Sequence, residues 1–582
     1  MSRRPCPPRA ERTPDPSGPG RSTARRRGVG LALLGMILSS CGSPSEDVAD
    51  LVLHNGRVVT LDEGIPEGEA IAIRDGRVQA VGSNAEVQAF VGSRTEVVDL
   101  DGRLAIPGFI EGHGHFMGVG QSRMQLNLMG VANWDEVIEM VAAAVAEAEP
   151  GVLIQGRGWH QEKWDRTPEP NVEGLPFHDG LSAVSPENPV ILRHASGHAS
   201  YANALAMELA GIDATTQAPA GGEIVRGPDG VPIGVFRETA SGLLRPAFDA
   251  AIPLDPYRQA ALASEEALSK GITSFQDAGV GFGTVDLYRE LADAGDLGVR
   301  LYVAIRTGNE EMAEKLAEYR VIGYGDDHLT VRGIKKSIDG ALGPHGAWLL
   351  EPYSDLPTST GLNTTPPDVI EGAADLALEH DYQLWIHAIG DRANRETLDI
   401  FEAAYAASNA EDLRWRVEHA QHLHPDEIPR FGALGIIASM QGVHATSDGP
   451  WVEPRLGAKR AEEGAYVWQK LMRSGAVVTN GTDAPVEDVD PIASYYATVS
   501  RMMNNGERFY PDQRMTRMEA LRSYTSANAY AAFEEDLKGT LTVGKLGDVT
   551  VLSRDILEIP EEEIPGTEVD FTIVGGEIRF RR

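Results

Sequence analysis

Cysteine, basic residues and long apolar runs are all scarce in this sequence, and each shortage excludes a class of protein. Cys6 and Cys41 are the only two cysteines in 582 residues, which excludes a disulfide-rich scaffold. Acidic residues outnumber basic ones by 86 to 52, and the formal net charge is −34. A protein that binds a nucleic-acid backbone needs a basic face, so we expect no nucleic-acid partner. What remains is 42% hydrophobic residues in a chain long enough to bury a large core.

The N-terminal segment has the composition of an export signal. Arg25, Arg26 and Arg27 precede the run VGLALLGMIL, which is far shorter than the roughly 20 apolar residues of a membrane-spanning helix. A basic stretch, a short apolar stretch and small residues are typical of a secretory signal. The run ends in Leu-Ser-Ser-Cys at Cys41, which resembles the bacterial lipobox; a chance cysteine after an apolar run is the alternative. We therefore predict a signal peptide over residues 1–41 and lipidation of Cys41.

This signal determines the expected compartment. A lipidated Cys41 would anchor an exported chain to a bacterial membrane, facing the periplasm or the exterior, and we expect no other contact with a membrane. The mature chain would then contain no free thiol, because Cys6 is removed with the signal. In that case a cysteine nucleophile and thiolate metal ligands are excluded.

Short β patterns at both ends of the remaining chain predict a small domain shared by the two termini. Asn-Gly and Asp-Gly pairs punctuate LVLHNGRVVTLD and AIAIRDGRVQAVG near the N-terminus, and DVTVLSRD and VDFTIVGGEIRFRR near the C-terminus have the same character. Neither set is long enough to bury a core alone. We therefore expect residues 48–107 and 536–582 to form one β sandwich.

Between these flanks, apolar β runs alternate with helical patterns such as PDVIEGAADLALEH over residues 108–535. Eight β runs joined by crossover helices are what a TIM-type (β/α)8 barrel contains, so we predict this α/β fold. A large insertion, at about residues 117–265, must follow the first run. The eight runs are LAIPGFIEGHGHF, GITSFQD, VRLYVAIR, VRGIKKSIDG, YQLWIHAIGD, LRWRVEHA, GIIASMQ and AVVTNGTDA.

Polar residues stand at the ends of five of these runs, where a barrel of this type places its chemistry. The first run ends in His113 and His115, which alternation along a strand puts on one side. Lys335 and Lys336 lie in the fourth run, where an ammonium group is costly to bury without a partner. Imidazole and carboxylate groups suit a divalent ion such as Zn²⁺, whereas each histidine taken singly is equally consistent with a hydrogen-bonded structural residue. The other members of the set are His387, His419 and Asp483.

The stretches around these residues are similar to the amidohydrolase superfamily and, within it, to the amidohydrolase-3 family, which includes formamide deformylases. The resemblance runs from about residue 49 to residue 582. One departure is Glu111, because the family has an aspartate before the His-x-His pair. The matching stretches are PGFIEGHGHF, SGHASYANALAMELAGI, GGEIVRGPDGVPIGVFRE, IKKSIDGALG, LWIHAIGDRAN, RVEHAQ, NGTDAPVE and KGTLTVGKLGDVTVL.

The resemblance implies a centre with two divalent ions, zinc being the preferred metal and a single ion the alternative. The first histidine pair, His113 and His115, would bind the more buried ion, and His387 and His419 would bind the more exposed one. The full set of implied metal ligands is His113, His115, Lys335, His387, His419 and Asp483.

Two of these ligands have a further implied role. Lys335 matches the family lysine that is carboxylated and bridges two metals, and Lys336 is the alternative. A carbamate is anionic, which would answer the cost of burying an ammonium group. Asp483 would act as a catalytic proton shuttle.

The implied activity is hydrolysis of a carbon–nitrogen bond other than a peptide bond in a small-molecule substrate. An amide or an N-substituted formamide would be attacked by metal-bound hydroxide, with Asp483 moving the proton. Two alternatives stay open. One is a metal-dependent esterase or lactonase using the same site, and the other is a lipoprotein that binds a ligand without turnover.

Further residues are candidates for contact with the substrate. His198 is a candidate for catalysis and for binding the substrate or oxyanion, with an ordinary polar loop residue as the alternative. His444 follows the seventh run and could line the pocket, and Trp159 could form an aromatic wall or pack the insertion onto the barrel. Asp339 is grouped with these residues because it would support Lys335 or cap its loop. Asp277 ends the second run and could instead cap a helix.

Overall fold

The computed structural model describes residues 48–582 except 129, 162–163, 195–198, 220–221, 252–254, 344 and 409–411. The predicted signal peptide over residues 1–41, its Cys41 and the candidate His198 lie outside the described residues. Within the described part of the chain, no helix is both long and apolar enough to span a membrane.

Eight parallel strands form the centre of the fold, and each pairs with the strand before and after it in the chain. Their residues are buried almost throughout, as expected of a parallel sheet covered on both faces. This is the strand order of the predicted (β/α)8 barrel. The strands are β8 (Phe109–Gly114), β17 (Ile272–Val280), β18 (Arg300–Ile305), β20 (Leu329–Ser337), β21 (Gln383–Ala388), β22 (Arg416–His419), β23 (Ile437–Gln441) and β24 (Val478–Gly481).

The first and last strands approach each other at their carboxyl ends and nearly close the barrel. The Asp483 N–H donates to the carbonyl of His113 at 2.7 Å, and the Thr482 N–H donates to Glu111 Oε1 at 2.6 Å. Gly481 makes this approach feasible, because a Cβ atom there would lie 2.6 Å from both Glu111 Oε1 and the His113 nitrogen. Both strand ends therefore contribute side chains to the same small volume.

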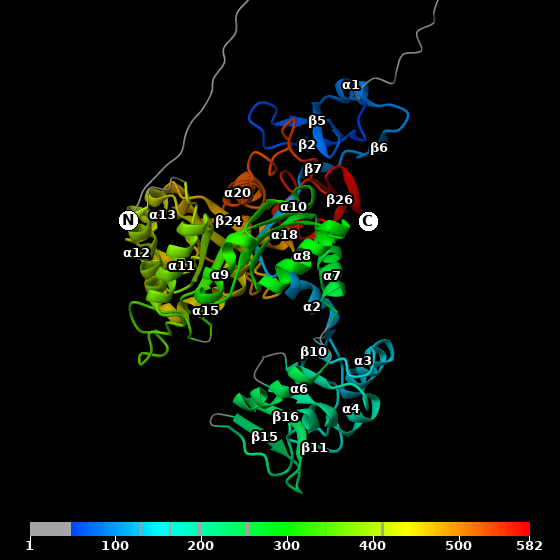
Figure 1. The fold of residues 1–582 in the computed structure, drawn as a ribbon, viewed down its shortest axis with the longest axis vertical. Coiled ribbons are helices and arrows are strands. Elements are labelled where there is room, and N and C mark those ends of the chain that lie inside the picture. The colour runs from blue at the N-terminus through cyan, green and yellow to red at the C-terminus, as the bar shows by residue number, and fades with distance from the viewer. Residues whose placement is uncertain are drawn as a thin grey trace, which may run out of the picture. The chain divides into compact units, whose positions relative to one another are not determined.

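Helices that follow the strands cover the outer face of the sheet (Figure 1). Each buries one apolar stripe. In α12, for example, Leu398 and Phe401 are buried while Glu402 is exposed. The helices visible on this face are α7 (Pro256–Ser269), α8 (Phe282–Ala294), α9 (Asn309–Tyr319), α11 (Pro367–His380) and α12 (Asp391–Ala407).

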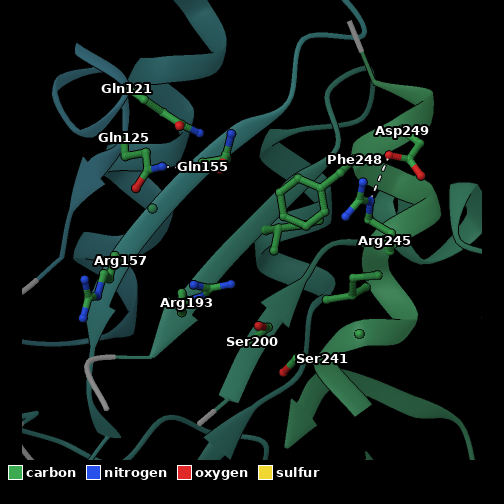
Figure 2. Close-up of a pocket in the computed structure, with 14 residues that line it drawn as sticks. Gln121, Gln125, Gln155, Arg157, Arg193, Ser200, Ser241, Arg245, Phe248 and Asp249 are labelled. Atoms are coloured by element: carbon green, nitrogen blue, oxygen red, sulfur yellow. Dashed lines mark hydrogen bonds and ion pairs between the residues drawn. The ribbon is translucent and has the colours of Figure 1, made fainter. Parts of the chain in front are cut away.

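A second sheet, of six strands, is formed by the residues between β8 and β17. Residues 222–226 and 232–238 form an antiparallel pair there, with Ile224 opposite Phe236. One face of this sheet lines a pocket (Figure 2). In spatial order the strands are β15 (Gly222–Arg226), β16 (Pro232–Glu238), β14 (Ala199–Ala202), β13 (Val190–His194), β10 (Ile154–Trp159) and β9 (Leu126–Asn127).

The strands near the two ends of the chain form two further sheets, and one of these sheets contains strands from both ends. In one of them β25 (Val549–Leu552) pairs with β7 (Leu104–Pro107), so the C-terminal and N-terminal segments share a sheet. Leu53 and Ile71 of the other sheet belong to the same apolar cluster as Ile573. The remaining strands are β1 (Leu51–His54), β2 (Arg57–Val59), β3 (Glu67–Gly68), β4 (Ala70–Arg74), β5 (Arg77–Gly82), β6 (Glu96–Asp99), β26 (Val569–Val574) and β27 (Glu577–Arg581).

Candidate metal centre

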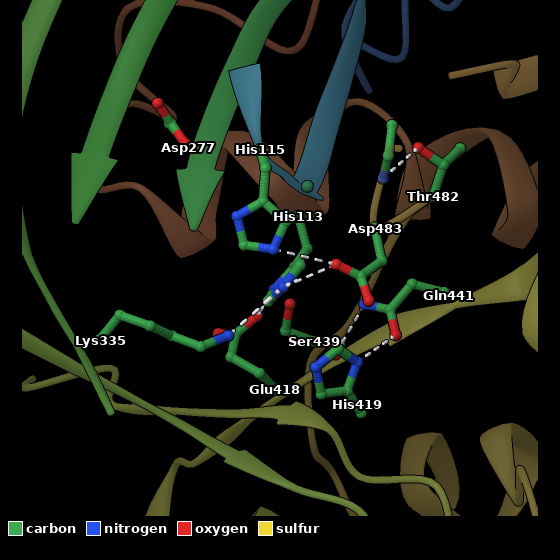
Figure 3. A network of polar contacts seen from close by, with 12 residues as sticks. His113, His115, Asp277, Lys335, Glu418, His419, Ser439, Gln441, Thr482 and Asp483 are labelled. Carbon is green, nitrogen blue, oxygen red and sulfur yellow. Dashed lines mark hydrogen bonds and ion pairs between the residues drawn. The ribbon is translucent and has the colours of Figure 1, made fainter. Parts of the chain in front are cut away.

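Three of the predicted ligands converge at the carboxyl end of the barrel. His113 ends β8, His419 ends β22 and Asp483 follows β24. One ligand atom from each lies within 4.8 Å of the other two, and all three residues are buried. In Figure 3 dashed lines join the rings of His113 and His115 to the Asp483 carboxylate, and the ring of His419 to Gln441. The barrel thus brings His113 close to residues that lie 306 and 370 positions further along the chain.

The ring of His113 is held in one orientation by a buried ion pair. Its Nδ1 contacts the Glu418 carboxylate. Arg416 Nε donates to Glu418 Oε1 at 2.7 Å, and neither of these two side chains has any solvent-exposed surface. Because a carboxylate can only accept, Nδ1 carries the proton and the lone pair of His113 is on Nε2.

His419 is oriented in the same way by an amide. Its Nδ1 lies 2.8 Å from Gln441 Oε1, so the ring nitrogen donates and Nε2 keeps its lone pair. Outer partners that fix the tautomer of an imidazole are typical of histidines that bind metals.

These contacts bring acceptor atoms face to face. His113 Nε2 lies 3.5 Å from Asp483 Oδ1, although neither atom carries a proton when the carboxylate is ionised and Glu418 holds the other ring nitrogen. Two lone pairs directed at each other are unfavourable unless a positive charge lies close to both, and here Lys335 Nζ lies 3.3 Å from His113 Nε2. The donor set of two imidazoles and one carboxylate therefore fits a divalent ion such as zinc.

The other predicted ligands surround this cluster. His115 Nε2 lies 3.3 Å from Asp483 Oδ1. The ring of His387 lies 4.5 Å from that of His419, between ring centres. Lys335 Nζ lies 3.3 Å from His113 Nε2. Lys336 points elsewhere and donates to the Thr307 carbonyl at 2.6 Å, so the geometry favours Lys335 of the two lysines.

Burial controls the protonation of the basic groups here. It lowers the pKa of His113 to about 4 and that of His387 to about 3, and the nearby Lys335 charge acts in the same direction. Burial also lowers the pKa of Lys335 to about 8. The imidazoles are thus neutral at pH 7, as metal ligation requires.

The acidic groups are kept ionised despite their burial. Burial alone would raise the pKa of Asp483, but the hydrogen bond from His115 and the neighbouring imidazoles hold it well below its usual range. Arg416 and His113 do the same for the pKa of Glu418. Glu111 differs, because burial raises its pKa to about 8.

The predicted substrate-contact residues separate into two groups. His444 lies near the cluster, with its ring centre 6.3 Å from that of His419. Asp339 accepts from the backbone N–H groups of Ile389 at 3.0 Å and Gly390 at 2.8 Å, so it ties down the loop after β21, and burial raises its pKa to about 7. Asp339 also accepts from the Trp348 N–H at 2.9 Å, in the loop after β20, which is the contact of a residue that caps the loop of Lys335, and it lies 3.5 Å from His387.

Trp159 and Asp277 make mainly structural contacts. Trp159 is 1% exposed, packs among the apolar side chains of its own sheet and donates from its indole N–H to the Leu192 carbonyl at 2.9 Å. Asp277 accepts from the Tyr288 hydroxyl at 2.7 Å and lies 3.4 Å from the N–H of Phe116, the first residue of α2 (Phe116–Met124). The structure does not bring Trp159 to the metal cluster.

Glu418, Arg416 and Gln441 were missed in the sequence. The sequence pattern could have indicated Arg416 and Glu418, because Arg-Val-Glu-His places two opposite charges inside a buried strand. The same burial cost that drew attention to Lys335 applies to them. Gln441 carries no charge and gave no such signal.

Comparison with known proteins agrees with this geometry. The model of a single family, the amidohydrolase family, matches residues 96–580. The chain belongs to this family. Protein LONG AFTER FAR-RED 3 of Arabidopsis thaliana is 35% identical over 553 residues, covering 93% of each chain. The N-substituted formamide deformylase of Arthrobacter pascens is 27% identical, covering 92% of this chain and 98% of the relative.

Solved structures with a similar fold also include a metal-dependent hydrolase. An uncharacterized metal-dependent hydrolase from Pyrococcus furiosus superposes with a TM-score of 0.72 at 27% identity. The match covers 87% of this chain and 100% of the other. Family membership and this likeness support a hydrolase with a divalent metal and a TIM-type barrel.

Proposed function

We propose that this protein is a metal-dependent hydrolase of carbon–nitrogen bonds other than peptide bonds, acting on a small amide or N-substituted formamide. The observation that carries the proposal is the convergence of His113, His419 and Asp483 in a chain of the amidohydrolase family. A relative named for deformylation of N-substituted formamides supports this substrate class.

The centre would hold two divalent ions, preferably zinc. His113, His115 and Asp483 would hold one, and His387 and His419 the other. Lys335 would be carboxylated and contribute to both. A divalent ion bound there supplies a Lewis acid that makes water more acidic and polarises a carbonyl group.

Asp483 is the residue that would move the proton. Its pKa lies well below its usual range, so the carboxylate is ionised at neutral pH, which is the form that can accept a proton. Oδ1 lies 3.3 Å from His115 Nε2, and this contact keeps the carboxylate aimed into the centre. The same carboxyl group would then donate the proton to the leaving nitrogen. His444, whose ring centre lies 6.3 Å from that of His419, would contact the substrate.

The proposal extends to the placement of the chain. Residues 1–41 would direct export, and lipidated Cys41 would hold the enzyme at a bacterial membrane, facing the periplasm or the exterior. The six-stranded sheet would act as an insertion into the barrel, and the sheets at the two ends of the chain as one β sandwich. His198 would contact the substrate or its oxyanion.

A substrate panel tests the function directly. Full-length protein purified without chelators is assayed with N-substituted formamides, other small amides, and matched esters and lactones. We expect turnover of amide-type substrates that chelation abolishes and zinc restores. Turnover of the esters or lactones alone would replace the proposed bond class, and no turnover of any compound by the metal-loaded protein would contradict a hydrolase.

A further inference from the structure

Two arginines lie side by side on the six-stranded sheet. In the parallel pairing of β10 and β13, Arg157 is directly opposite Arg193, and Ser200 of β14 is opposite Arg193 on the other side. A polar row therefore crosses three neighbouring strands. All three residues line one pocket, and Figure 2 shows both arginine side chains at its wall.

Neither arginine has a partner for its charge. Among the described residues, no side chain forms a hydrogen bond or an ion pair with the guanidinium of Arg157 or Arg193. Among the described residues that line the pocket, Asp249 is the one acidic residue, and it is already bonded to Arg245 at 3.0 Å. The pocket is thus cationic, in a chain whose net charge is −34.

This arrangement is unfavourable without a ligand. Like charges directly opposite each other on neighbouring strands repel each other. The chain contains 86 acidic residues, yet no described one pairs with either arginine. A guanidinium presents a planar fork that matches a carboxylate or a phosphate group. An anion between Arg157 and Arg193 would convert the repulsion into two charge-assisted hydrogen-bonding sites.

The pocket has the size and neighbours of a small-molecule site. Its volume is about 650 Å³, within the usual range for such sites. Gln121 and Gln125 add neutral hydrogen-bonding groups. A neighbouring hollow shares these two glutamines and Arg157, and it is also lined by Ala484 and Pro485, which directly follow Asp483 in the chain. A ligand held by the arginines could therefore extend toward the metal centre.

We propose that Arg157 and Arg193 bind the anionic group, a carboxylate or a phosphate, of a small substrate whose amide is hydrolysed at the metal centre. This assignment of the ligand as a substrate rests on the proposed function, whereas binding of an anion does not. The two arginines act as specificity-determining residues.

Calorimetric titration tests the anion site without any assay of activity. Full-length wild type is titrated with inorganic phosphate and, separately, with malonate in a low-salt buffer. We expect one site per chain for at least one of the two anions and a loss of affinity of about tenfold or more in Arg157→Gln and in Arg193→Gln. The comparison of phosphate with malonate distinguishes the two anion types.

Arg166→Gln is the matched control for this experiment. Arg166 is another exposed arginine of the same region, but it pairs with Asp135 at 2.7 Å and does not line the pocket. We expect its affinity for the anion to equal that of wild type. Equal binding by all variants, or no binding of either anion by a wild type with a normal thermal unfolding curve, would overturn the anion site.

Kinetics then tests the link to the substrate. Wild type is compared on two matched amides that differ only in a carboxylate remote from the scissile bond. We expect a lower KM for the anionic amide and loss of this preference in Arg193→Gln, with kcat little changed. Equal KM values in wild type would overturn the substrate role. If neither amide is hydrolysed, the proposed function fails, while the titration still decides the anion site.

Discussion

The metal cluster in the barrel and the arginine pair on the six-stranded sheet differ in whether their charged side chains have partners of opposite charge. In the barrel, Arg416 and Glu418 are fully buried and satisfy each other before any ligand binds. On the sheet, Arg157 and Arg193 are exposed and have no acidic partner among the described residues. The charges of the first arrangement are paired within the protein, whereas those of the second would be paired only by a bound anion. Disturbing either should therefore have different consequences.

The largest effect is expected from Asp483→Asn. The amide keeps the shape of the side chain but cannot accept the proton, so we expect kcat to fall by about 10² to 10⁴ on a substrate found in the panel. Circular dichroism and thermal unfolding should stay close to those of wild type. Turnover near the wild-type rate would contradict the role of Asp483 as proton shuttle.

A smaller effect is expected when the buried ion pair of the barrel is broken. Glu418→Gln leaves the Arg416 charge buried without its partner and removes the anionic acceptor of His113. We expect a loss of about 3 kcal/mol in the free energy of unfolding and a roughly 10- to 100-fold weaker affinity for zinc. Urea unfolding and zinc titration measure the two quantities.

Asp249→Asn is the matched control from the other region. Its ion pair with Arg245 is solvent-exposed on both sides, with 63% and 78% of the side-chain surfaces accessible. Breaking an exposed pair should change the free energy of unfolding by less than about 1 kcal/mol. Equal losses in Glu418→Gln and Asp249→Asn would remove the contrast between the two regions.

An effect smaller than that of Glu418→Gln concerns His422, which follows β22 and lies outside the metal cluster. Burial lowers its pKa to about 3, and neither ring nitrogen has a hydrogen-bond partner among the described residues. In the unfolded chain its pKa is about 6.5, so the unfolded state takes up a proton as the pH falls and the folded state does not. Its contribution to stability is therefore present above pH 6.5 and is lost progressively toward pH 3.

His422→Phe tests this sign. Between pH 7 and pH 5, wild type should lose up to about 2 kcal/mol more stability than the variant, because the variant has no proton to bind at this position. Urea unfolding at the two pH values measures the difference. His424→Gln is the control, because its side chain is 40% exposed and it lies four residues before the start of α13 (Ile428–Leu434). An equal pH dependence of wild type and His422→Phe would contradict the account.

The sequence alone was sufficient for the barrel and for most of the cluster. Eight apolar runs were recognisable because a parallel sheet buries both faces. His113, Lys335, His419 and Asp483 stood out because polar groups at the ends of such runs are costly unless they bind something. The roles of these residues stay predictions.

The sequence was less informative about residues whose function depends on pairing across strands. Nothing in the sequence around Asp339 predicts that its carboxylate accepts hydrogen bonds from backbone N–H groups of the loop after β21. Arg157 and Arg193 each looked like one exposed residue of an alternating strand, and only the register of β10 with β13 makes them neighbours. Trp159 was open to two interpretations because an aromatic side chain fits a core as well as a pocket.

The most direct test of the account is the metal content of the full chain, purified in bicarbonate without chelators and measured by elemental analysis. We predict about two divalent ions per chain, and loss of metal in His113→Ala and His419→Ala. About one ion would keep the centre but assign Lys335 another role. No bound metal in folded protein, even after zinc is added back, would contradict the claim that His113, His419 and Asp483 form a metal centre.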